Sequence, residues 1–451
     1  MIGTTVPITD GAAANEDRPL KILIAGGGIG GCSAAIFLRH AGHTVEIFES
    51  SRFASETGAA IHIPSNANGL LRRMGMIPEE HGANQCEWVS ETRPNGEQIF
   101  LQDVRMLSKV FPNPWQLIHR VDLHNSLKEI ATSAKGKGKP AVLHLRSRVV
   151  KVDPEAPSLT LEDGTTHTGD LIIAADGIHS RIRGALIKDL PPPEPSGSSA
   201  FRFLIPADEI RADPKTAHFV ERTGELMLLY GADRRIVVYP CKQNTYLNFV
   251  AMHPDEESEA NRDDWDQQAS KETMLRCFDS YPEDVKALLA KADPKGINLW
   301  KLLDHDELGK ENWVHGKIAL MGDAAHAFLP HQGQGGAQAI EDAAALGALL
   351  PLGTQVSDIP KRLELYVQAR YNRATMIQDF SRQAAFKTPR GKHGGKVMDH
   401  LQFTENNFRH DAFEHARDIL LREQVKPARQ RYMPLSFGPA PRRTHDLDII
   451  V

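Results

Sequence analysis

The stretch Lys21–Glu49, KILIAGGGIGGCSAAIFLRHAGHTVEIFE, decides the fold of this chain. An apolar run is followed by GGGIGG, by a predicted helix, and by a second apolar run that ends on Glu49. Gly26, Gly28 and Gly31 occupy the glycine positions of the dinucleotide-binding fingerprint, which needs a tight turn, a close approach of the backbone to a pyrophosphate, and close packing of helix on strand. Glu49 lies where a carboxylate can hydrogen-bond an adenosine ribose. We therefore predict a Rossmann-like unit and not a glycine-rich surface turn.

The composition of the 451-residue chain is that of an ordinary globular protein. Hydrophobic residues make up 41% and charged residues 25%, which excludes a wholly disordered chain. A formal net charge of -5 gives no reason to expect nucleic acid as a partner, so small molecules are the expected ligands. The 4 cysteines are scattered and form no CxxC pair. We therefore expect neither a metal site nor a disulfide framework, and we expect a reducing compartment, the cytoplasm.

The ends of the chain match no targeting signal. Residues 1–19 lack the basic start and apolar core of a secretory signal, and we expect them to form a loose tail. Residues 426–451 contain several prolines and are expected to be an extended tail. No uninterrupted apolar run approaches the ~18 residues that span a bilayer, so we expect a soluble protein without a membrane span.

Two places after Glu49 are candidates for contact with a dinucleotide. Gly58–Ile63 follows the second predicted strand, where a turn of small residues suits either a close approach to a cofactor ring or an ordinary surface turn. Arg120 begins a predicted helix with Leu123 and Leu127 at helical spacing, and its charge could meet a phosphate or water. Both alternatives stay open at each place.

The middle of the chain changes from an α/β pattern to a strand pattern. Alternating strands surround the Asp163-Gly164 turn, and LIIAADG then places Asp176 at the edge of the sheet where ligands bind. Pro191–Ser199, PPPEPSGSS, has the composition of a linker. Four apolar segments within Ala200–Met252 predict a mostly antiparallel sheet, carried as a second domain.

The second informative stretch is Lys317–Gly336, KIALMGDAAHAFLPHQGQGG. A buried strand is expected to deliver Asp323 to a glycine-rich loop that runs into an alanine-rich helix. The start of that helix can bind an anion or a flavin carbonyl, because backbone N–H groups and the positive end of the dipole point at it. His326 and His331 are either site residues or polar surface residues. The helices within 359–386 and 400–422 are expected to pack on the chain or to form a homodimer surface.

Three motifs together carry a resemblance to a known family: GGGIGG with Glu49, DGIHSRIR at Asp176–Arg183, and GDAAHAFLPHQGQGG at Gly322–Gly336. In this order and separation they resemble the single-component FAD-dependent aromatic hydroxylases, the group A flavin monooxygenases of the para-hydroxybenzoate hydroxylase fold. The similarity is strongest to salicylate hydroxylases and their fungal relatives in secondary metabolism. It runs from about residue 20 to residue 371.

The resemblance implies which residues hold FAD. The expected FAD-binding residues are Gly26, Gly28, Gly31, Glu49, Gly58, Ala59, Arg120, Asp176, Asp323, Pro330, Gly333, Gly335 and Gly336. Asp176, Gly177 and Arg183 are expected to serve both FAD and a visiting nicotinamide. The chain has no second strand-GxGxxG-helix unit, as in family members that receive NADH or NADPH without a separate domain.

The resemblance also implies a reaction. FAD is expected to take a hydride from NADPH or NADH and to transfer oxygen from O2, through C4a-hydroperoxyflavin, to a phenolic or other electron-rich aromatic substrate, with or without decarboxylation as for salicylate. Arg202 and Tyr239 lie on apolar strands where relatives hold a phenolate; Tyr230 competes with Tyr239, and both residues have a purely structural alternative. His331 could position the substrate beside the flavin loop.

The expected architecture is an α/β chain with a Rossmann-like FAD-binding domain, a mostly antiparallel β-sheet substrate domain and C-terminal helices. The expected boundaries are a tail at 1–19, the FAD-binding domain at 20–190 and 301–386, the substrate domain at 191–300, and a C-terminal helix and tail at 387–451. Two other functions stay open. One is epoxidation or indole oxidation in natural-product synthesis on the same fold, and the other is a flavin-binding protein without turnover.

Overall fold

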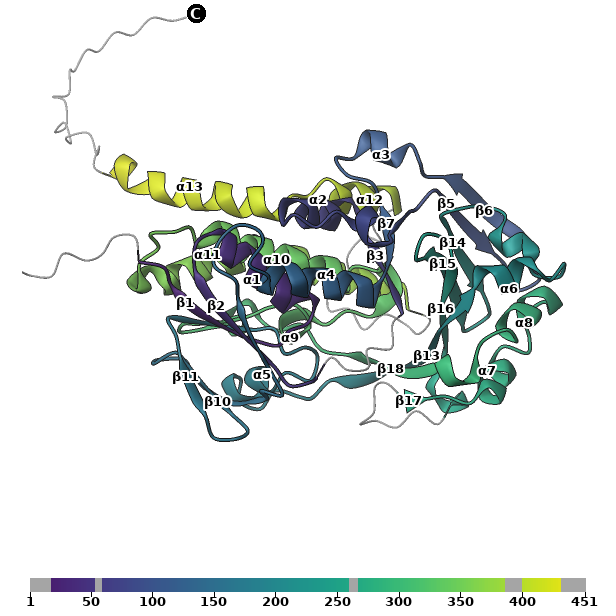
Figure 1. Ribbon diagram of the computed structural model, residues 1–451, viewed down its shortest axis with the longest axis horizontal. Coiled ribbons are helices and arrows are strands. Elements are labelled where there is room, and N and C mark those ends of the chain that lie inside the picture. Colours follow the sequence, from purple (N-terminus) through teal and green to yellow (C-terminus); the bar gives the residue numbers. More distant parts are fainter. Residues whose placement is uncertain (1–17, 53–58, 259–266, 386–399, 431–451) are drawn as a thin grey trace, which may run out of the picture.

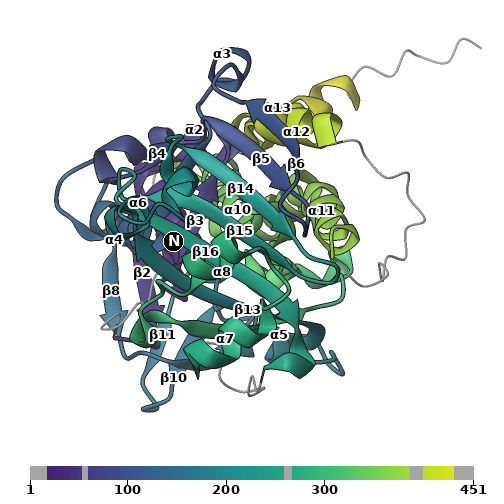
Figure 2. The same ribbon diagram turned by 90° about the vertical axis from the view of Figure 1, so that its right-hand side faces the viewer.

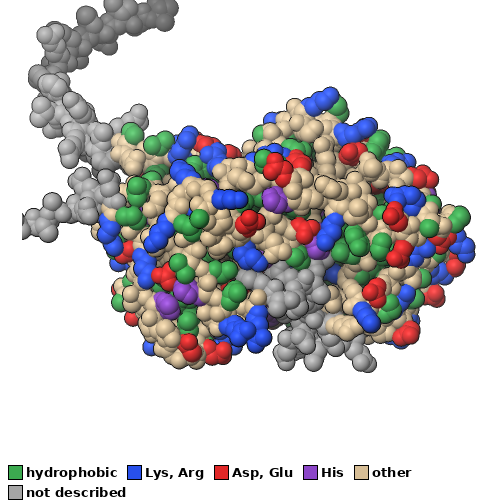
Figure 3. Space-filling view, viewed as in Figure 1, with side chains coloured by type: hydrophobic (Ala, Val, Ile, Leu, Met, Phe, Trp, Pro, Cys, Tyr) green, Lys and Arg blue, Asp and Glu red, His purple; other side chains and the backbone are tan. Residues whose placement is uncertain are grey.

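The computed structural model describes residues 18–52, 59–258, 267–385 and 400–430. Two β-sheet layers stand beside each other, as Figure 1 shows, with most of the long helices gathered around the first. Among the described residues no helix is both long and apolar enough to cross a membrane. Lys, Arg, Asp and Glu are interspersed over the face in Figure 3, which shows no extended patch of one sign. The tails expected at 1–19 and 426–451 lie almost wholly outside the described residues.

The first layer is a six-stranded sheet with the order β19-β20-β12-β1-β2-β8, parallel except for β19. Its strands are β1 (Lys21–Ala25), β2 (Thr44–Glu49), β8 (Val142–Leu145), β12 (Leu171–Ala174), β19 (Val314–His315) and β20 (Ile318–Leu320). The apolar runs predicted as strands at residues 21–25 and 44–49 are confirmed. A three-stranded sheet of β9 (Val149–Asp153), β10 (Ser158–Leu161) and β11 (Thr166–Thr168) lies next to it.

Helices from distant parts of the chain gather around the first sheet, some packed on its strands and others on neighbouring helices. They are α1 (Ile29–His40), α2 (Ser65–Arg73), α4 (Arg120–Thr132), α5 (Arg181–Leu186), α9 (Asp323–His326), α10 (Gly335–Leu349), α11 (Ile359–Gln383), α12 (His400–Phe408) and α13 (Ala412–Gln430). Helix α10 is hydrophobic nearly all round because it packs between α1, α11 and α13. The segment expected to form one helix over 400–422 forms two, and α13 continues to Gln430, so residues 426–430 are helical and not an extended tail.

The second layer is an eight-stranded sheet with the order β17-β18-β13-β16-β15-β14-β5-β6. Its strands are β5 (Trp88–Thr92), β6 (Gln98–Asp103), β13 (Glu194–Pro206), β14 (Glu225–Tyr230), β15 (Arg235–Cys241), β16 (Tyr246–Pro254), β17 (Gln267–Gln268) and β18 (Asn298–Asp304). All pairs are antiparallel except β14 with β5, which confirms the mostly antiparallel sheet. Helices α6 (Ala207–Arg211), α7 (Lys271–Cys277) and α8 (Glu283–Leu289) cover its outer face, which is turned to the viewer in Figure 2.

The linker predicted at Pro191–Ser199 is wrong over most of its length. Strand β13 begins at Glu194, and Ser198 already pairs with Pro254 of β16. Glu194 and Pro195 pair with β18, the register then shifts before Ser199, and Gly197 has φ +82°, so glycine and serine occupy an irregular part of the strand. The strand therefore begins where composition alone indicates a loop.

A small sheet joins the two layers. It consists of β3 (Ala60–Ile63), β7 (Gln116–His119) and β4 (Asn84–Gln85). Its outer connections include α3 (Leu107–Val110) and a 3-10 turn at Pro78–His81. The turn predicted over Gly58–Ile63 is wrong for residues 60–63, because these residues form strand β3, which lies between the two large sheets in Figure 1.

A buried cluster of charges fixes α10 to α11. Glu341 and Asp342 of α10 and Arg370 of α11 are fully buried. Arg370 donates Nε to Asp342 Oδ1 at 2.7 Å and a terminal nitrogen to Glu341 Oε2 at 2.5 Å, and Arg373 donates to both oxygens of Glu341. Burial alone would raise the pKa of Glu341, but the Arg373 and Arg370 guanidinium groups hold it well below its usual range. The two acids are therefore ionised and compensated within the core.

We predict that Arg370→Met lowers the free energy of unfolding by about 3–5 kcal/mol, because it leaves two buried carboxylates with too little positive charge. Urea denaturation of the purified protein measures this change. The matched control is Arg409→Met, since Arg409 forms an exposed pair with Glu405 at 3.1 Å; we expect it to change stability by no more than about 0.5 kcal/mol. Equal effects of both variants would contradict a stabilising role of the buried cluster.

Candidate functional site

The three glycines of the first motif are each required for a different reason. Gly26 has φ +100°, and a Cβ there would lie 2.2 Å from the Ala175 carbonyl oxygen. A Cβ on Gly31 would lie 2.0 Å from the Gly26 carbonyl oxygen, so only glycine lets α1 pack on the turn. A Cβ on Gly28 would meet nothing within 4 Å. This open space beside the start of α1 lies where a pyrophosphate must approach the backbone.

Glu49 is held against the glycine turn. Its Oε2 accepts a hydrogen bond from the Gly27 amide at 2.8 Å, and its Oε1 accepts one from the Ser51 amide at 2.6 Å. These bonds fix the carboxylate at the carboxyl end of β2, the edge of a parallel sheet where nucleotides bind. Gly58 lies outside the described residues.

Asp176 and Arg183 tie the second motif to the third. Asp176 accepts hydrogen bonds from the Ser180 hydroxyl at 2.6 Å and from the Arg181 amide at 2.9 Å, so it orders the start of α5. Burial raises the pKa of Asp176, against these hydrogen bonds. Arg183 is 4% exposed and donates to the backbone carbonyls of Asp323 at 3.2 Å and Ala324 at 3.0 Å. The structure thus brings both motifs to one edge of the sheet.

The third motif surrounds the same edge. Gly322 follows β20, and its amide donates a hydrogen bond to Oδ2 of the buried Asp342 at 2.8 Å. His326 Nε2 lies 2.6 Å from the same oxygen. The Asp323 side chain lines a cavity. Desolvation raises the pKa of its carboxyl, against the charges of Arg120 and Arg183. His326 is buried in this contact, so of the two predicted histidines only His331 lines the cavity.

The glycine-rich loop packs against β3. A Cβ on Gly336 would lie 2.6 Å from Ile61, and Gly333 has φ +61° with its Cβ position 3.0 Å from His62. The loop therefore needs glycine to place the start of α10 beside β3.

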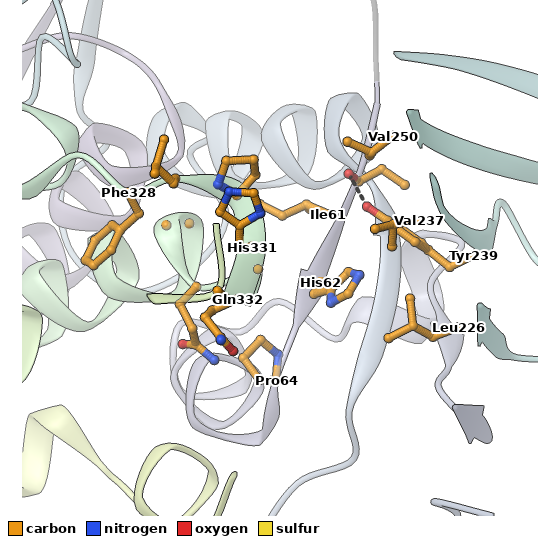
Figure 4. Close-up of a pocket in the computed structure, with 18 of the residues that line it drawn as sticks. Ile61, His62, Pro64, Leu226, Val237, Tyr239, Val250, Phe328, His331 and Gln332 are labelled. Carbon is orange, nitrogen blue, oxygen red and sulfur yellow. Dashed lines mark hydrogen bonds between the residues drawn. The ribbon is translucent and has the colours of Figure 1, made fainter. Parts of the chain in front are cut away.

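One cavity of about 870 Å³ lies between the motifs and the eight-stranded sheet. Figure 4 shows its two sides: Phe328, His331 and Gln332 come from the loop before α10, and Val237, Tyr239 and Leu226 come from the sheet. The predicted residues that line it are Gly28, Arg120, Asp323, Pro330, Gly333, Gly335, Gly336, Arg202, Tyr239 and His331, together with Tyr230. The predicted residues that do not line it are Gly26, Gly31, Glu49, Ala59 and Asp176, which support the walls or lie beside them.

Arg120 lies at the boundary between the two sides. Its amide donates to the Ala59 carbonyl oxygen at 3.1 Å, which fixes the start of α4 next to β3. Its side chain lines the cavity together with Asp323. The charge of Arg120 therefore faces the cavity and not bulk water alone.

The sheet side presents Arg202 and Tyr239. The guanidinium carbon of Arg202 lies 3.8 Å from the centre of the Trp300 ring, a cation–π arrangement. Tyr239 is 4% exposed and donates its hydroxyl to the Ala60 carbonyl oxygen at 2.7 Å (Figure 4). Burial raises the pKa of Tyr239 well above its usual range, so the phenol stays neutral and acts as a donor.

Two further cavity residues, Arg235 and His62, are not among the residues predicted from the sequence. Arg235 is 6% exposed and its guanidinium lies 2.8 Å from His331 Nδ1. Desolvation and the neighbouring Arg235 lower the pKa of His331 to about 3, so His331 is neutral at neutral pH. The signal for Arg235 is strand alternation, because residues 235, 237 and 239 of RRIVVYPC share one face. His62 packs edge-on against Tyr239 at 4.6 Å, and burial lowers its pKa to about 4.

The residues present fit an FAD. The glycine turn of β1 and α1 offers open space for a pyrophosphate, Glu49 is fixed beside it, and the start of α10 with its glycines faces the same cavity. The opposite wall of the cavity, formed by the eight-stranded sheet, is apolar and carries two arginines, so it could contact a second molecule.

Comparison with known proteins identifies the class. The model of the family described as "FAD binding domain" matches residues 19–381. The chain is 37% identical to hispidin-3-hydroxylase of Neonothopanus nambi, over 81% of this chain and 88% of that protein. It is 35% identical to the FAD-dependent monooxygenase cfoG of Aspergillus candidus, over 92% of this chain and 96% of that protein. A salicylate hydroxylase substrate complex superimposes with a TM-score of 0.70 at 27% identity, over 89% of this chain and 98% of that one.

The chain belongs to the FAD binding domain family of flavoproteins and is an FAD-dependent monooxygenase of the aromatic hydroxylase type. This result confirms the resemblance inferred from the three motifs. It also confirms FAD as the cofactor.

The different surroundings of Gly28 and Gly31 predict different consequences of the same substitution. Gly28→Ala should leave the melting temperature of the FAD-free protein unchanged, because nothing lies within 4 Å of the new methyl group. It should weaken FAD binding, since overpacking costs about 1–3 kcal/mol, or roughly 5- to 150-fold in Kd. Gly31→Ala should lower the melting temperature of the FAD-free protein itself. Flavin fluorescence titration and thermal melting separate the two effects, and a Gly28→Ala variant with unchanged FAD affinity would contradict the assignment.

Proposed function

We propose that this monooxygenase uses NADPH or NADH and O2 to hydroxylate a phenolic aromatic substrate that binds against the eight-stranded sheet. The observation that carries the proposal is the shared cavity: the nucleotide-binding motifs form one side, and an apolar sheet face with two arginines forms the other. The names of hispidin-3-hydroxylase and salicylate hydroxylase denote hydroxylation of such compounds by those proteins. Neither name fixes the substrate of this chain.

The lining of the sheet side supports an aromatic substrate with an acidic oxygen. Val237, Val250 and Met252 supply an apolar surface, and Trp300 adds an aromatic face. Arg202 and Arg235 bring positive charge to this surface. Arg235 lies 2.8 Å from the neutral His331 at the cavity wall, and its guanidinium would attract a phenolate or a carboxylate.

The size of the cavity supports a substrate more extended than a single small ring. Its volume of about 870 Å³ includes the space beside the glycine motifs that the cofactor would fill. The apolar lining of the cavity includes Phe100 of β6 and extends beyond the sheet to Leu107 of α3 and Phe403 of α12. This apolar lining would hold a ring system with a conjugated or aromatic extension.

The residues in place fit the cofactor's needs, and FAD, when bound, would supply hydride acceptance and oxygen transfer. Gly28, Arg120 and Asp323 would hold it, with the loop before α10 facing its ring. The chain itself would exclude water by closing the apolar sheet over the cavity, and it would orient the aromatic carbon by anchoring the substrate oxygen at Arg235. Tyr239, whose hydroxyl is engaged by Ala60, would support β3 and contribute its ring to the wall.

Purified holoenzyme should be yellow, and a phenolic substrate should accelerate its oxidation of NADPH or NADH. The expected readouts are oxygen uptake and a product that has gained one oxygen atom. Exchange of a carboxyl group for a hydroxyl would instead show hydroxylation with decarboxylation. A screen of mono- and bicyclic phenols with both nicotinamides makes the measurement, with the corresponding methyl ethers as controls for the acidic oxygen. Nicotinamide oxidation that no aromatic compound accelerates would contradict the proposal.

Arg235→Met should lower kcat/KM for the phenolic substrate by about 10- to 150-fold, because a hydrogen bond to a charged group contributes about 1.5–3 kcal/mol. FAD affinity should stay the same, and more of the consumed nicotinamide should appear as hydrogen peroxide, since the substrate is no longer held in place. The control is Arg211→Met, an exposed arginine of α6 paired with Asp208. Unchanged kcat/KM in Arg235→Met would exclude Arg235 from substrate binding.

A further inference from the structure

Three metal-ligating side chains meet on the side of the first sheet away from the cavity. They are Glu46 of β2, His144 of β8 and His167 of β11. His144 Nε2 lies 3.0 Å and His167 Nδ1 lies 3.7 Å from Glu46 Oε2, and the three ligand atoms all lie within 4.8 Å of one another. None of the three residues lines the cavity.

The strand arrangement explains why residues so distant in sequence converge. Strands β2 and β8 are parallel neighbours, with Phe48 opposite His144, and Glu46 lies two residues before Phe48 on the same face. His167 comes from the adjacent three-stranded sheet. The Phe48 ring stacks on His144 at 4.6 Å and meets His167 edge-on at 4.7 Å. One aromatic ring therefore holds both imidazoles in orientation.

The carboxylate has its two oxygens turned to different partners. Glu46 Oε1 lies 2.9 Å from the Lys21 ammonium, and Oε2 faces the two imidazoles. Oε2 is therefore the carboxylate oxygen that both imidazoles face, and it is the atom that would join them in binding an ion.

We propose that Glu46, His144 and His167 bind one divalent transition-metal ion of the zinc type, with water as a fourth ligand. Zinc bonds of about 2.0–2.1 Å to nitrogen and oxygen make the donor–donor edge of a tetrahedron about 3.3 Å, between the two distances to Glu46 Oε2. Two imidazoles exclude magnesium and calcium as the preferred ion, because these take oxygen ligands. Side-chain exposures of 16%, 30% and 23% for Glu46, His144 and His167 leave the site open to an ion from solution.

The ion would join two sheets that backbone pairing does not join. β2 and β8 belong to the six-stranded sheet, and β11 belongs to the three-stranded one. A bound ion would stabilise the folded state in proportion to its concentration over its Kd. The role is structural and independent of the proposed hydroxylation.

The test is a titration of EDTA-treated, FAD-loaded protein with zinc chloride. Isothermal calorimetry measures the binding, and thermal melting measures the change in stability. We expect one saturable site and a rise in melting temperature. His167→Ala should weaken binding by at least about tenfold, since loss of even a supporting partner of a ligand commonly costs that much. The control is His218→Ala, whose histidine lies 3.2 Å from Asp284 without belonging to a three-ligand group among the described residues. It should bind zinc as the original protein does.

Flavin absorbance and the metal-free melting temperature show whether His167→Ala is folded. If it is not, Glu46→Gln provides the second variant, because it keeps the shape of the side chain and removes the charge. Absence of saturable zinc binding by the original protein, or unchanged affinity in a folded variant, would overturn the proposal.

Discussion

The carboxylate of Asp342 is the constraint on which the site depends. One of its oxygens accepts the Gly322 amide and lies beside His326, and the other accepts the Arg370 guanidinium. A buried carboxylate is unfavourable unless its charge is compensated, so the position of α11 and the geometry of the loop after β20 are determined together. Asp323 is the next residue after Gly322, and its direction toward the cavity follows from this anchoring.

Strand β3 links the loop before α10 to the eight-stranded sheet. On one side Gly333 before α10 and Gly336 in its first turn pack closely against His62 and Ile61. On the other side the Tyr239 hydroxyl and the Asn248 amide oxygen bind the Ala60 carbonyl and amide. Glycine packing on one side and hydrogen bonds on the other therefore fix a short strand of four residues between the two walls of the cavity.

The sequence is sufficient for the parts of the fold that local rules determine. The glycine spacing and the apolar runs of residues 21–49 predict the βαβ unit, because the contacts that require these residues lie within or next to that unit. The contribution of β5 and β6 to the second sheet is not predictable in this way, since β5 pairs with β14 across 137 residues of sequence and β6 joins the sheet through β5. Strand alternation could have indicated Arg235, which shares a face with Tyr239, but the group around Glu46 is not predictable because its members come from strands that only the folded chain brings together.

The path of the chain has a consequence for how relatives of this protein can diverge. The polypeptide leaves the first layer for β5 and β6, returns through β7, and leaves again at β13 before it comes back at β19. No division of the sequence at one position separates the strands of the first layer from those of the eight-stranded sheet. Neither layer can therefore be transferred as one continuous segment. New substrate preferences must therefore arise by point changes on the inner strand faces or in their loops, and recombination of whole halves would leave strands without neighbours.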